Sequence, residues 1–271
     1  MFSTIEITIK ISIRGNCLYS IFVKINQVFS IFKSKPRLSE IIPTGYVDIH
    51  SHILPGIDDG AENISQTTKL LDGLHKIGFS NCIVTPHTLP EIWENTTNGI
   101  IETFHSTKQD LEDPLKSMLQ SCASEYMINE AFLVRLQTEP LLTIKDNIVL
   151  IEMSYLNPPL ALKEIIFEIQ LKGYQPLLAH PERYLFYHQN TKMYHTLKDL
   201  EVKFQLNLLS AVGYYGDKVA KAADFLLKEN LIDFVGSDVH HMKHVNAFEN
   251  KIIIKSEVQL KKAIARNSFF K

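Results

Sequence analysis

The sequence predicts an α/β fold of parallel strands and helices, with a barrel favoured over an open sheet. Short apolar runs alternate with longer segments of helical period, as in a parallel sheet covered by helices. Polar residues able to bind metals stand at the end of nearly every apolar run. In an α/β barrel the carboxyl ends of all strands meet at one face, whereas in an open sheet only strands near a switch point share a site. The distribution of these polar residues therefore favours the barrel.

Strands are expected where short runs are apolar at their start and lack polar alternation, which is typical of buried parallel strands. Seven segments fit this description. They are residues 46–50, 81–87, 121–127, 147–155, 175–181, 203–210 and 232–241.

Three helices are marked clearly between these strands. Residues 65–78 place leucines on one face and end at Gly78, and residues 157–173 begin near prolines and end at Gly173. Residues 216–231 carry an apolar stripe at helical spacing. Each helix lies between two expected strands, so the order of elements supports the α/β assignment.

The composition is that of a globular protein with a full core: 271 residues, of which 45% are hydrophobic and 21% charged. The net charge of −2, with scattered Lys and Arg, argues against a nucleic-acid-binding surface. Three cysteines in a chain of this length form no disulfide framework and indicate a reducing compartment. We therefore expect a cytoplasmic protein.

Residues 1–45 are expected to be an N-terminal extension and linker, and residues 46–271 the domain. Charged residues interrupt the apolar stretches of the extension, so no run reaches the ~18 residues of a membrane span, and no signal-peptide cleavage site is evident. Because Val28 is a plausible start decoded from an alternative initiation codon, we hypothesise that residues 1–27 are not translated natively. Peptides from this segment in mass spectra of the native protein would contradict the hypothesis.

The strand ends supply a set of histidines and carboxylates. Alternate residues of a strand share a face, so His50 and His52 point together, and Asp238 and His240 repeat this spacing. The set exceeds the roughly four to six ligands of one ion and suits two or three ions bridged by carboxylates. Clustered metals are typical of enzymes that hydrolyse phosphate esters. The expected ligands are His50, His52, the Asp58–Asp59 pair, His87, Glu125, Glu152, His180, Asp238 and His240.

Several other polar residues accompany this set. Arg183 follows His180 by three residues, and its planar fork suits bidentate contact with phosphate oxygens, although an ion pair with Glu182 is the alternative. Asp48 is expected to orient a histidine. His241 and His244 are compatible both with lining the site and with a polar rim. The remaining histidines are expected at the surface: His75, His105, His188 and His195.

The cysteines exclude one class of phosphatase. A thiol-based phosphatase needs a Cys followed by five residues and then Arg, so that the loop cradles the phosphate. No Arg stands at that position after Cys17, Cys82 or Cys122. Phosphatase chemistry in this chain must therefore be metal-based.

Six motifs in this order resemble the polymerase and histidinol phosphatase (PHP) superfamily: DIHSHILPGIDDGA, TPH, ASEYM, LIEMSY, LAHPERY and GSDVHH. Within it the chain is similar to the bacterial capsular and exopolysaccharide-type protein-tyrosine phosphatases. The resemblance runs from about Val47 to the C-terminal helix, and the first and last motifs are quite specific. It implies a distorted seven-stranded (β/α) barrel, which is TIM-like, with a trinuclear site that usually binds Mn²⁺. Fe, Zn or Co are compatible with the same ligands.

The resemblance also implies how the ligands divide among three ions. Asp59 rather than Asp58 matches the family's aspartate, because it directly precedes Gly60. The implied sets are His50, His52, Glu125 and Asp238 for the first ion, Glu125, Glu152 and His180 for the second, and Asp59, His87 and His240 for the third.

The implied substrate is phosphotyrosine in the tyrosine-rich tail of a bacterial tyrosine kinase that controls polysaccharide polymerisation and export. A metal-bridging hydroxide would attack the phosphorus, and Arg183 would be the catalytic residue that holds the phosphoryl group. Tyr155 and Lys243 are expected to contact the substrate. Many members carry a second arginine near the position of Lys243, and a lysine is a point charge rather than a fork.

Three other functions are compatible with parts of this pattern. A small-molecule phosphoesterase, acting on histidinol phosphate or a sugar phosphate, needs the same metals; a deep Arg-rich pocket would favour it, and an open apolar rim would favour a protein substrate. An amidohydrolase usually bridges its metals with a modified lysine, where this chain has Glu125 and Glu152. A non-catalytic binding module is disfavoured by the complete ligand set, and the oligomeric state is left open. The candidate rim residues are Ile92, Trp93, Tyr155, Tyr184, Tyr214 and Tyr215.

Overall fold

The structure, a computed structural model, describes residues 8–10, 20–22 and 34–271. The chain divides into two compact units, residues 1–35 and 36–271. In the first unit, β1 (Thr8–Lys10) pairs with β2 (Ser20–Phe22) in antiparallel fashion. The hypothesis that residues 1–27 are not translated falls largely outside the described residues and stays a prediction.

The second unit begins at Pro36, earlier than the boundary expected at residue 46. Leu38 is fully buried, and its amide donates to the carbonyl of Asn250 at 3.0 Å. The amide of Ser39, which opens the 3₁₀ helix η2 (Ser39–Ile41), donates to the carbonyl of Phe248 at 2.8 Å. The residues just before the first core strand are therefore part of this unit rather than a linker.

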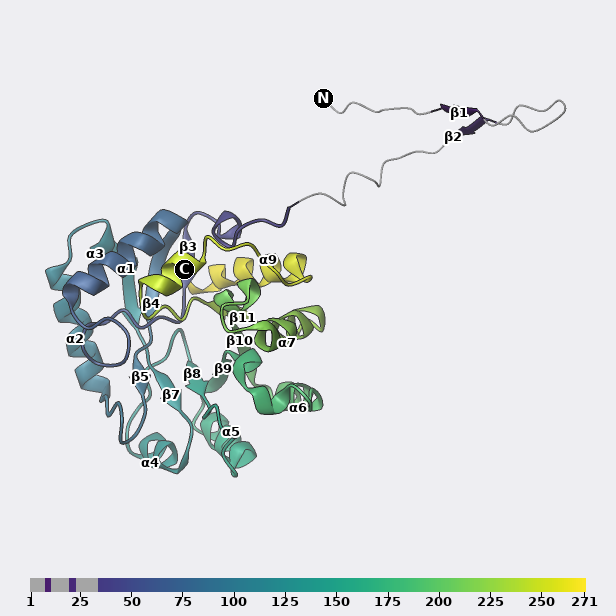
Figure 1. Ribbon diagram of the computed structural model, residues 1–271. Helices are drawn as coiled ribbons and strands as arrows, with labels where there is room; N and C mark the ends of the chain where they lie inside the picture. Colours follow the sequence, from purple (N-terminus) through teal and green to yellow (C-terminus); the bar gives the residue numbers. More distant parts are fainter. Residues whose placement is uncertain (1–7, 11–19, 23–33) are drawn as a thin grey trace. The chain divides into compact units, whose positions relative to one another are not determined.

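The strands of the second unit form two sheets of parallel strands, and Figure 1 shows these strands at the centre of that unit. One sheet has the order β3 (Tyr46–Asp48), β4 (Phe79–Val84), β6 (Leu119–Cys122). The other has the order β11 (Phe234–Gly236), β10 (Lys203–Asn207), β9 (Gln175–Ala179), β8 (Ile148–Glu152), β7 (Glu125–Met127), β5 (His87–Thr88). The parallel α/β architecture is thus confirmed, but no closed sheet is found among residues 34–271, so the closed form of the predicted barrel is not observed.

The division into two sheets arises where two expected strands break in the middle. The run 81–87 splits at Pro86, which has no amide hydrogen to donate to a ladder, into β4 and β5. The neighbouring run 121–127 splits at the same level into β6 and β7. The amide of Glu125, the first residue of β7, donates to the carbonyl of Pro86 at 3.1 Å. Beyond the break β5 and β7 pair again, with His87 in register with Glu125. The break therefore brings two expected ligands side by side.

The two sheets nevertheless enclose one interior. A contiguous buried cluster combines Val47 and Ile83 from the three-stranded sheet with Leu150, Leu177 and Phe234 from the six-stranded sheet. Apolar side chains from both sheets are removed from water in this cluster, and this burial is a main source of stability. The two sheets therefore share one interior, although the hydrogen-bonded ladder between them is interrupted.

The gap between β3 and β11, the first and last core strands, is bridged in two ways. At the carboxyl ends, the amide of Asp238 donates to the carbonyl of His50 at 2.8 Å. Nearer the amino ends, the buried side chain of Asn267 takes the place of a ladder. Its Nδ2 donates to the carbonyls of Val47 at 3.0 Å and Val235 at 2.7 Å, and its Oδ1 accepts from the amide of Val235 at 3.1 Å. Asn267 opens the last 3₁₀ helix, η6 (Asn267–Phe270), so the end of the chain ties both strands together.

Asn267→Ala is expected to lower the free energy of unfolding by at least about 2 kcal/mol, because buried backbone groups on both strands lose their partner. Urea unfolding followed by circular dichroism would measure the change. Asn98→Ala, at an exposed position of the second helix, is the control and should change stability by less than about 0.5 kcal/mol. Equal effects of the two substitutions would contradict the assigned role of Asn267.

Helices surround the strands, as Figure 1 shows. The expected helices at 65–78, 157–173 and 216–231 are observed as α1, α5 and α7. Asn63 caps α1 by accepting from the amide of Gln66, and Gly78 ends it in the left-handed region at φ +119°. The helices are α1 (Ile64–Ile77), α2 (Thr97–Asp110), α3 (Leu115–Met118), α4 (Glu130–Thr138), α5 (Leu162–Leu171), α6 (Lys192–Asp199), α7 (Asp217–Lys228), α8 (Met242–Ala247) and α9 (Glu257–Arg266).

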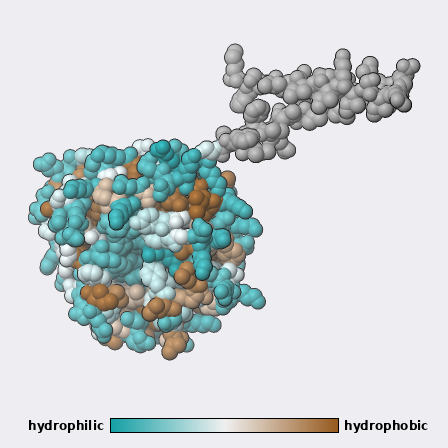
Figure 2. Space-filling view, viewed as in Figure 1, coloured by the Kyte–Doolittle hydropathy of each residue, from teal (hydrophilic) through white to brown (hydrophobic). Residues whose placement is uncertain are grey.

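The outer surface is mainly polar. Figure 2 shows a largely hydrophilic face of the second unit with scattered apolar patches. No helix in the described part of the chain is long and apolar enough to cross a membrane.

Candidate metal centre

The predicted ligands converge at the carboxyl ends of the strands. His50 and His52 follow β3, and His180 follows β9. The donor atoms fall into four overlapping groups, within each of which they lie within 4.8 Å of one another. The groups are His52, Asp59, His87 and His240; His50, Glu125 and His180; His50, His52 and Asp238; and His87, Glu125 and Glu152. The structure thus brings all nine of these side chains together.

The grouping agrees in part with the implied division among three ions. Asp59, His87 and His240 lie together, with His52 added to them. Glu152 lies with His87 and Glu125 rather than with His180. Glu125 is central, because its Oε1 lies 3.0 Å from Nε2 of His180 and its Oε2 lies 3.1 Å from Nε2 of His50. Its two carboxylate oxygens therefore face two different histidines.

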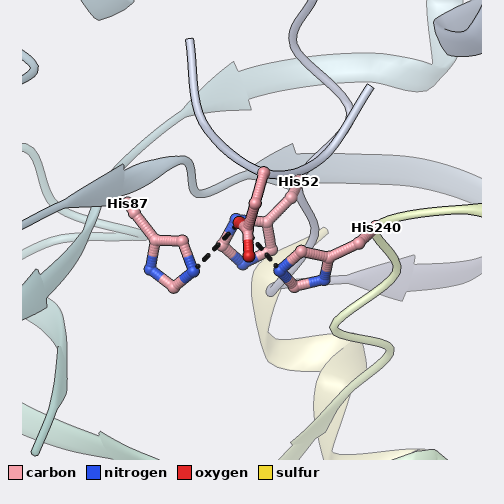
Figure 3. A group of neighbouring side chains, drawn as sticks. His52, His87 and His240 are labelled. Carbon is pink, nitrogen blue, oxygen red and sulfur yellow. Dashed lines mark ion pairs between the residues drawn. The ribbon is translucent and has the colours of Figure 1, made fainter. Parts of the chain in front are cut away.

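The two adjacent aspartates differ in their contacts, and those of Asp59 are the ones expected of a ligand. Its Oδ1 lies 3.4 Å from Nε2 of His87 and 3.4 Å from Nε2 of His240. Figure 3 shows the rings of His52, His87 and His240 around this point, with dashed lines for the ion pairs. Asp59 therefore faces the ring nitrogens that a metal would share.

Asp58 instead holds the outer side of His52. Its Oδ2 lies 2.7 Å from Nδ1 of His52 and accepts from the amide of His87 at 3.1 Å, while Oδ1 accepts from the amide of Gly60 at 2.9 Å. A carboxylate on the far nitrogen fixes the tautomer and the direction of an imidazole, leaving Nε2 free to face a metal. Asp58 is thus an orienting residue.

Gln205 plays the same part for His50, and the sequence reasoning missed it. Its Oε1 lies 2.8 Å from Nδ1 of His50, and both side chains are fully buried. A glutamine inside the apolar run of β10 was the signal that could have revealed it, because a buried polar group needs a partner. Its partner stands 155 positions earlier in the chain, which no local pattern indicates.

Asp48 does not orient a histidine, contrary to the expectation. Its Oδ2 accepts from Oγ of Ser237 at 2.5 Å, and its Oδ1 accepts from the amide of Ser237 at 2.9 Å and of Ile49 at 3.1 Å. Burial raises the pKa of this carboxyl to about 6, although these hydrogen bonds oppose the rise. Asp48 fastens the segment after β11 to β3, and so aligns the two ligand-bearing loops.

The buried carboxylates and histidines perturb one another strongly. Burial alone would lower the pKa of His50, but the charges of Glu125 and Asp238 outweigh it and raise this pKa to about 9. Burial would likewise raise the pKa of Glu125, but the surrounding histidines hold it well below its usual range. Burial and then the charge of Glu125 raise the pKa of Glu152. Positive charge within the cluster therefore stabilises the ionised form of these carboxylates.

This donor set fits divalent cations. Nε2 of His50 and Nε2 of His52 face each other at 3.2 Å. Nδ1 of His180 is buried without a hydrogen-bond partner. Oε2 of Glu125 and Nδ1 of His87 lie 3.2 Å apart, at ion-pair distance, but they form no hydrogen bond. Buried polar atoms rarely remain unpartnered, and convergent imidazole and carboxylate donors are the ligands of Mn, Fe, Zn and Co.

Arg183 lies at the edge of the cluster. Its Nη1 donates to Oδ2 of Asp238 at 2.7 Å, and its guanidinium lies 4.8 Å from the ring centre of Tyr155 and 4.3 Å from that of Tyr215. The alternative ion pair with Glu182 is not formed. Glu182 is buried and accepts from Oγ of Ser210 at 2.7 Å and from the amide of Asn207 at 2.9 Å.

Backbone strain accompanies this arrangement. His180 and Asp238 both adopt the left-handed region, at φ +37° and φ +50°. Non-glycine residues in this region cost free energy and are common at functional sites. These backbone conformations turn the chain sharply after β9 and β11, so that the side chains of His180 and Asp238 enter the cluster.

The remaining candidates lie in several environments. Tyr155 is 44% exposed, and its ring stacks on that of His180 with ring centres 5.8 Å apart. Lys243 is exposed on α8 and lines a hollow together with Asp59 and His241. His244 is buried, with Nδ1 accepting from the amide of His240 at 3.2 Å.

Two expectations about these surroundings were wrong. Tyr184 is fully buried and its hydroxyl accepts from the amide of Met153 at 2.9 Å, so it is not a rim residue. His188 is half-buried, and its Nε2 lies 2.7 Å from the carbonyl of Glu182. His75, His105 and His195 are exposed, as expected.

Several known proteins are similar in sequence to this chain over most of its length. The sequence profile for capsular polysaccharide synthesis, CpsB/CapC, matches residues 46–259. Tyrosine-protein phosphatase YwqE of Bacillus subtilis is 30% identical over 204 residues, which cover 74% of this chain and 79% of that protein. Tyrosine-protein phosphatase CpsB of Streptococcus pneumoniae is 26% identical over 202 residues, which cover 72% of this chain and 83% of that protein.

The fold is also similar to a solved structure. The match has a TM-score of 0.69 and 26% identity, and covers 83% of this chain and 88% of the other. It comes from the crystal structures of YwqE from Bacillus subtilis and CpsB from Streptococcus pneumoniae, described as unique metal-dependent tyrosine phosphatases. Since the profile, the relatives and the structure agree, this chain belongs to the capsular polysaccharide synthesis CpsB/CapC family.

Proposed function

We propose that this chain is a metal-dependent protein-tyrosine phosphatase whose substrate is a bacterial tyrosine kinase that regulates capsular polysaccharide or exopolysaccharide synthesis. The observation that carries the proposal is the position of Arg183, a guanidinium suited to anions, bonded to Asp238 at the edge of a nine-residue donor cluster. Family relatives named tyrosine-protein phosphatases support the choice of phosphotyrosine.

The cluster would hold three ions, with Mn²⁺ as the proposed metal. Such ions, when bound, polarise the phosphoryl oxygens and lower the pKa of a water molecule. Glu125 would be shared between ions, and Asp58 and Gln205, which lie against Nδ1 of His52 and of His50, would keep these imidazoles turned inward. The proposed ligands are His50, His52, Asp59, His87, Glu125, Glu152, His180, Asp238 and His240.

The chain's own residues would bind and orient the phosphate. The Arg183 fork makes parallel hydrogen bonds to two phosphate oxygens, and Asp238 and the two flanking tyrosine rings hold the guanidinium in place. Tyr155 offers its exposed ring to the aryl group, and Lys243 adds a positive charge at the mouth. Hydrolysis consumes one water, breaks the aryl P–O bond, and releases phosphate and tyrosine.

The rim favours a protein substrate over a small ester. Leu156 and Leu160, in the loop that follows Tyr155, are 87% and fully exposed. Apolar side chains beside the site suit contact with a polypeptide. The two described cysteines, Cys82 and Cys122, are free thiols, which supports action on the cytoplasmic side, where disulfides are rare.

A direct assay tests this proposal. The purified protein is expected to hydrolyse p-nitrophenyl phosphate, to lose this activity with a chelator, and to regain it with Mn²⁺. It should also prefer a phosphotyrosine peptide from a kinase tail to histidinol phosphate. Activity that withstands the chelator would overturn the metal-dependent mechanism, and a strong preference for histidinol phosphate would favour the small-molecule phosphoesterase instead.

Asp58→Asn is expected to weaken metal affinity and activity by roughly 10- to 100-fold, the usual cost of losing an orienting partner. The asparagine side chain has the same size, but it lacks the negative charge of the carboxylate that contacts Nδ1 of His52. Metal titration and p-nitrophenyl phosphate hydrolysis would measure both effects. Asp110→Asn, at an exposed position at the end of α2, is the matched control.

A further inference from the structure

A groove runs from the edge of the donor cluster along helices α1 and α8. Two adjoining hollows form it, of about 520 Å³ and about 370 Å³, and both are lined by Lys69 and Met242. The first hollow begins at Asp59, whose carboxylate faces His87 and His240. The groove is therefore continuous with the site.

The floor of the groove is apolar and its shape depends on one glycine. Leu70 and Val245 are almost fully buried below it, while Met242 is 37% exposed along it. A Cβ on Gly73 would lie 2.7 Å from Cγ1 of Val245, closer than carbon atoms pack. Gly73 thus lets α8 lie close against α1, and the two helices form a shallow trough.

The charges at the walls are not balanced along the groove. At the far end Lys76 pairs with Asp72 at 2.5 Å, and Glu249 pairs with Arg37 at 2.7 Å. Near the site, Lys69 and Lys243 form no ion pair with any residue that the structure describes. Two carboxylates line the same hollow: Asp59, which faces His87 and His240, and Glu62, which accepts from Nε2 of Gln66 at 3.0 Å. Apart from Asp59, which belongs to the donor cluster, this half of the groove therefore carries two positive charges against one negative charge.

The groove has the length of a short peptide. Its α1 wall carries Gln66, Lys69, Leu70, Gly73 and Ile77, which share one helical face. From the first to the last of these, the helix rises about 16 Å at ~1.5 Å per residue. An extended peptide of about five residues covers that distance.

We propose that this groove binds the polypeptide on one side of the substrate phosphotyrosine and selects an acidic residue there. The inference rests on the proposed phosphatase function and adds its sequence preference. The apolar floor takes up one side chain of the extended peptide, and Lys69 and Lys243 attract a carboxylate. A small aryl phosphate does not reach the groove, so its hydrolysis is independent of Lys69.

The test compares phosphotyrosine peptides with the metal-loaded enzyme. One peptide has neutral flanks, and others carry two Asp or two Lys on the N-terminal or the C-terminal side. Acidic residues on one side are expected to lower KM by about fivefold, as about 1 kcal/mol of screened attraction allows. Lys69→Glu should remove this preference and favour the Lys peptide, with p-nitrophenyl phosphate hydrolysis changed by less than twofold.

The control is Lys163→Glu, an equal charge change at an exposed position of α5, which should keep the acidic preference. If Lys69→Glu fails to fold, Lys69→Met should abolish the preference without reversing it. Equal KM values for all peptides, or a preference that survives both Lys69 variants, would overturn the groove assignment while leaving the phosphatase function intact. Hydrolysis of small esters but of no phosphotyrosine peptide would overturn both proposals.

Discussion

Glu125→Gln is expected to reduce kcat/KM for an aryl phosphate by at least about 10³-fold, because clustered metals contribute several kcal/mol and each 1.36 kcal/mol is tenfold. Glu125 takes part in two of the four donor groups and lies at ion-pair distance from His50, His52, His87 and His180. The glutamine side chain keeps the shape of Glu125 but lacks the negative charge that lies close to these four histidines. The bound-metal content of the purified variant should fall together with its activity.

His50→Ala and His180→Ala should have effects of the same order, since each removes a donor from the same cluster. His105→Ala is the control, because this histidine is exposed on α2. Wild-type activity and full metal content in Glu125→Gln would exclude the assigned bridging role. Circular dichroism of each variant separates loss of the site from loss of the fold.

Arg183→Lys is expected to lower kcat by roughly 10²- to 10³-fold, the usual cost of losing a group that stabilises transition-state charge. The lysine keeps one positive charge, but it lacks the two parallel donors of the guanidinium. It also cannot pack flat between Tyr155 and Tyr215 while bonded to Asp238. The loss should appear mainly in kcat, because the fork matters most when charge builds on the phosphoryl oxygens.

Metal content separates this effect from damage to the ligands. Arg183→Lys should bind metal as the wild type does, because Asp238 keeps its contacts with His50 and His52. Arg135→Lys is the matched control: this arginine, on α4, forms an ion pair with Glu139, the C-cap residue of the same helix, and no change in kcat is expected. A rise in KM alone, with kcat unchanged, would contradict a role in the transition state.

The sequence predicted which side chains lie together at the strand ends, because their spacing follows from the strands that carry them. Alternation places His50 and His52 on one face, and parallel strands end at a common level. The same reasoning located Glu125 and Glu152, each a carboxylate within an apolar run. Short-range periodicity was sufficient for these residues, because each position depends on its own strand.

The parts that the sequence did not predict depend on partners far apart in the chain. Gln205 matters through His50, and Asn267 through Val47 and Val235. The division of the sheet at Pro86 follows from how two neighbouring strands bend together. Asp58 and Asp59 differ only in the direction of their side chains, which a shared loop conformation determines. None of these relations leaves a periodic signal.

The bridge at Asn267 has a consequence for how the site is assembled during synthesis. The expected ligands His50 and His52 leave the ribosome well before Asp238 and His240, and Asn267 follows all four in the sequence. The side chain of Asn267 is one of the contacts that join β3 to β11, the strands that precede these ligands. A nascent chain therefore carries its proposed metal donors before this contact between their strands can form.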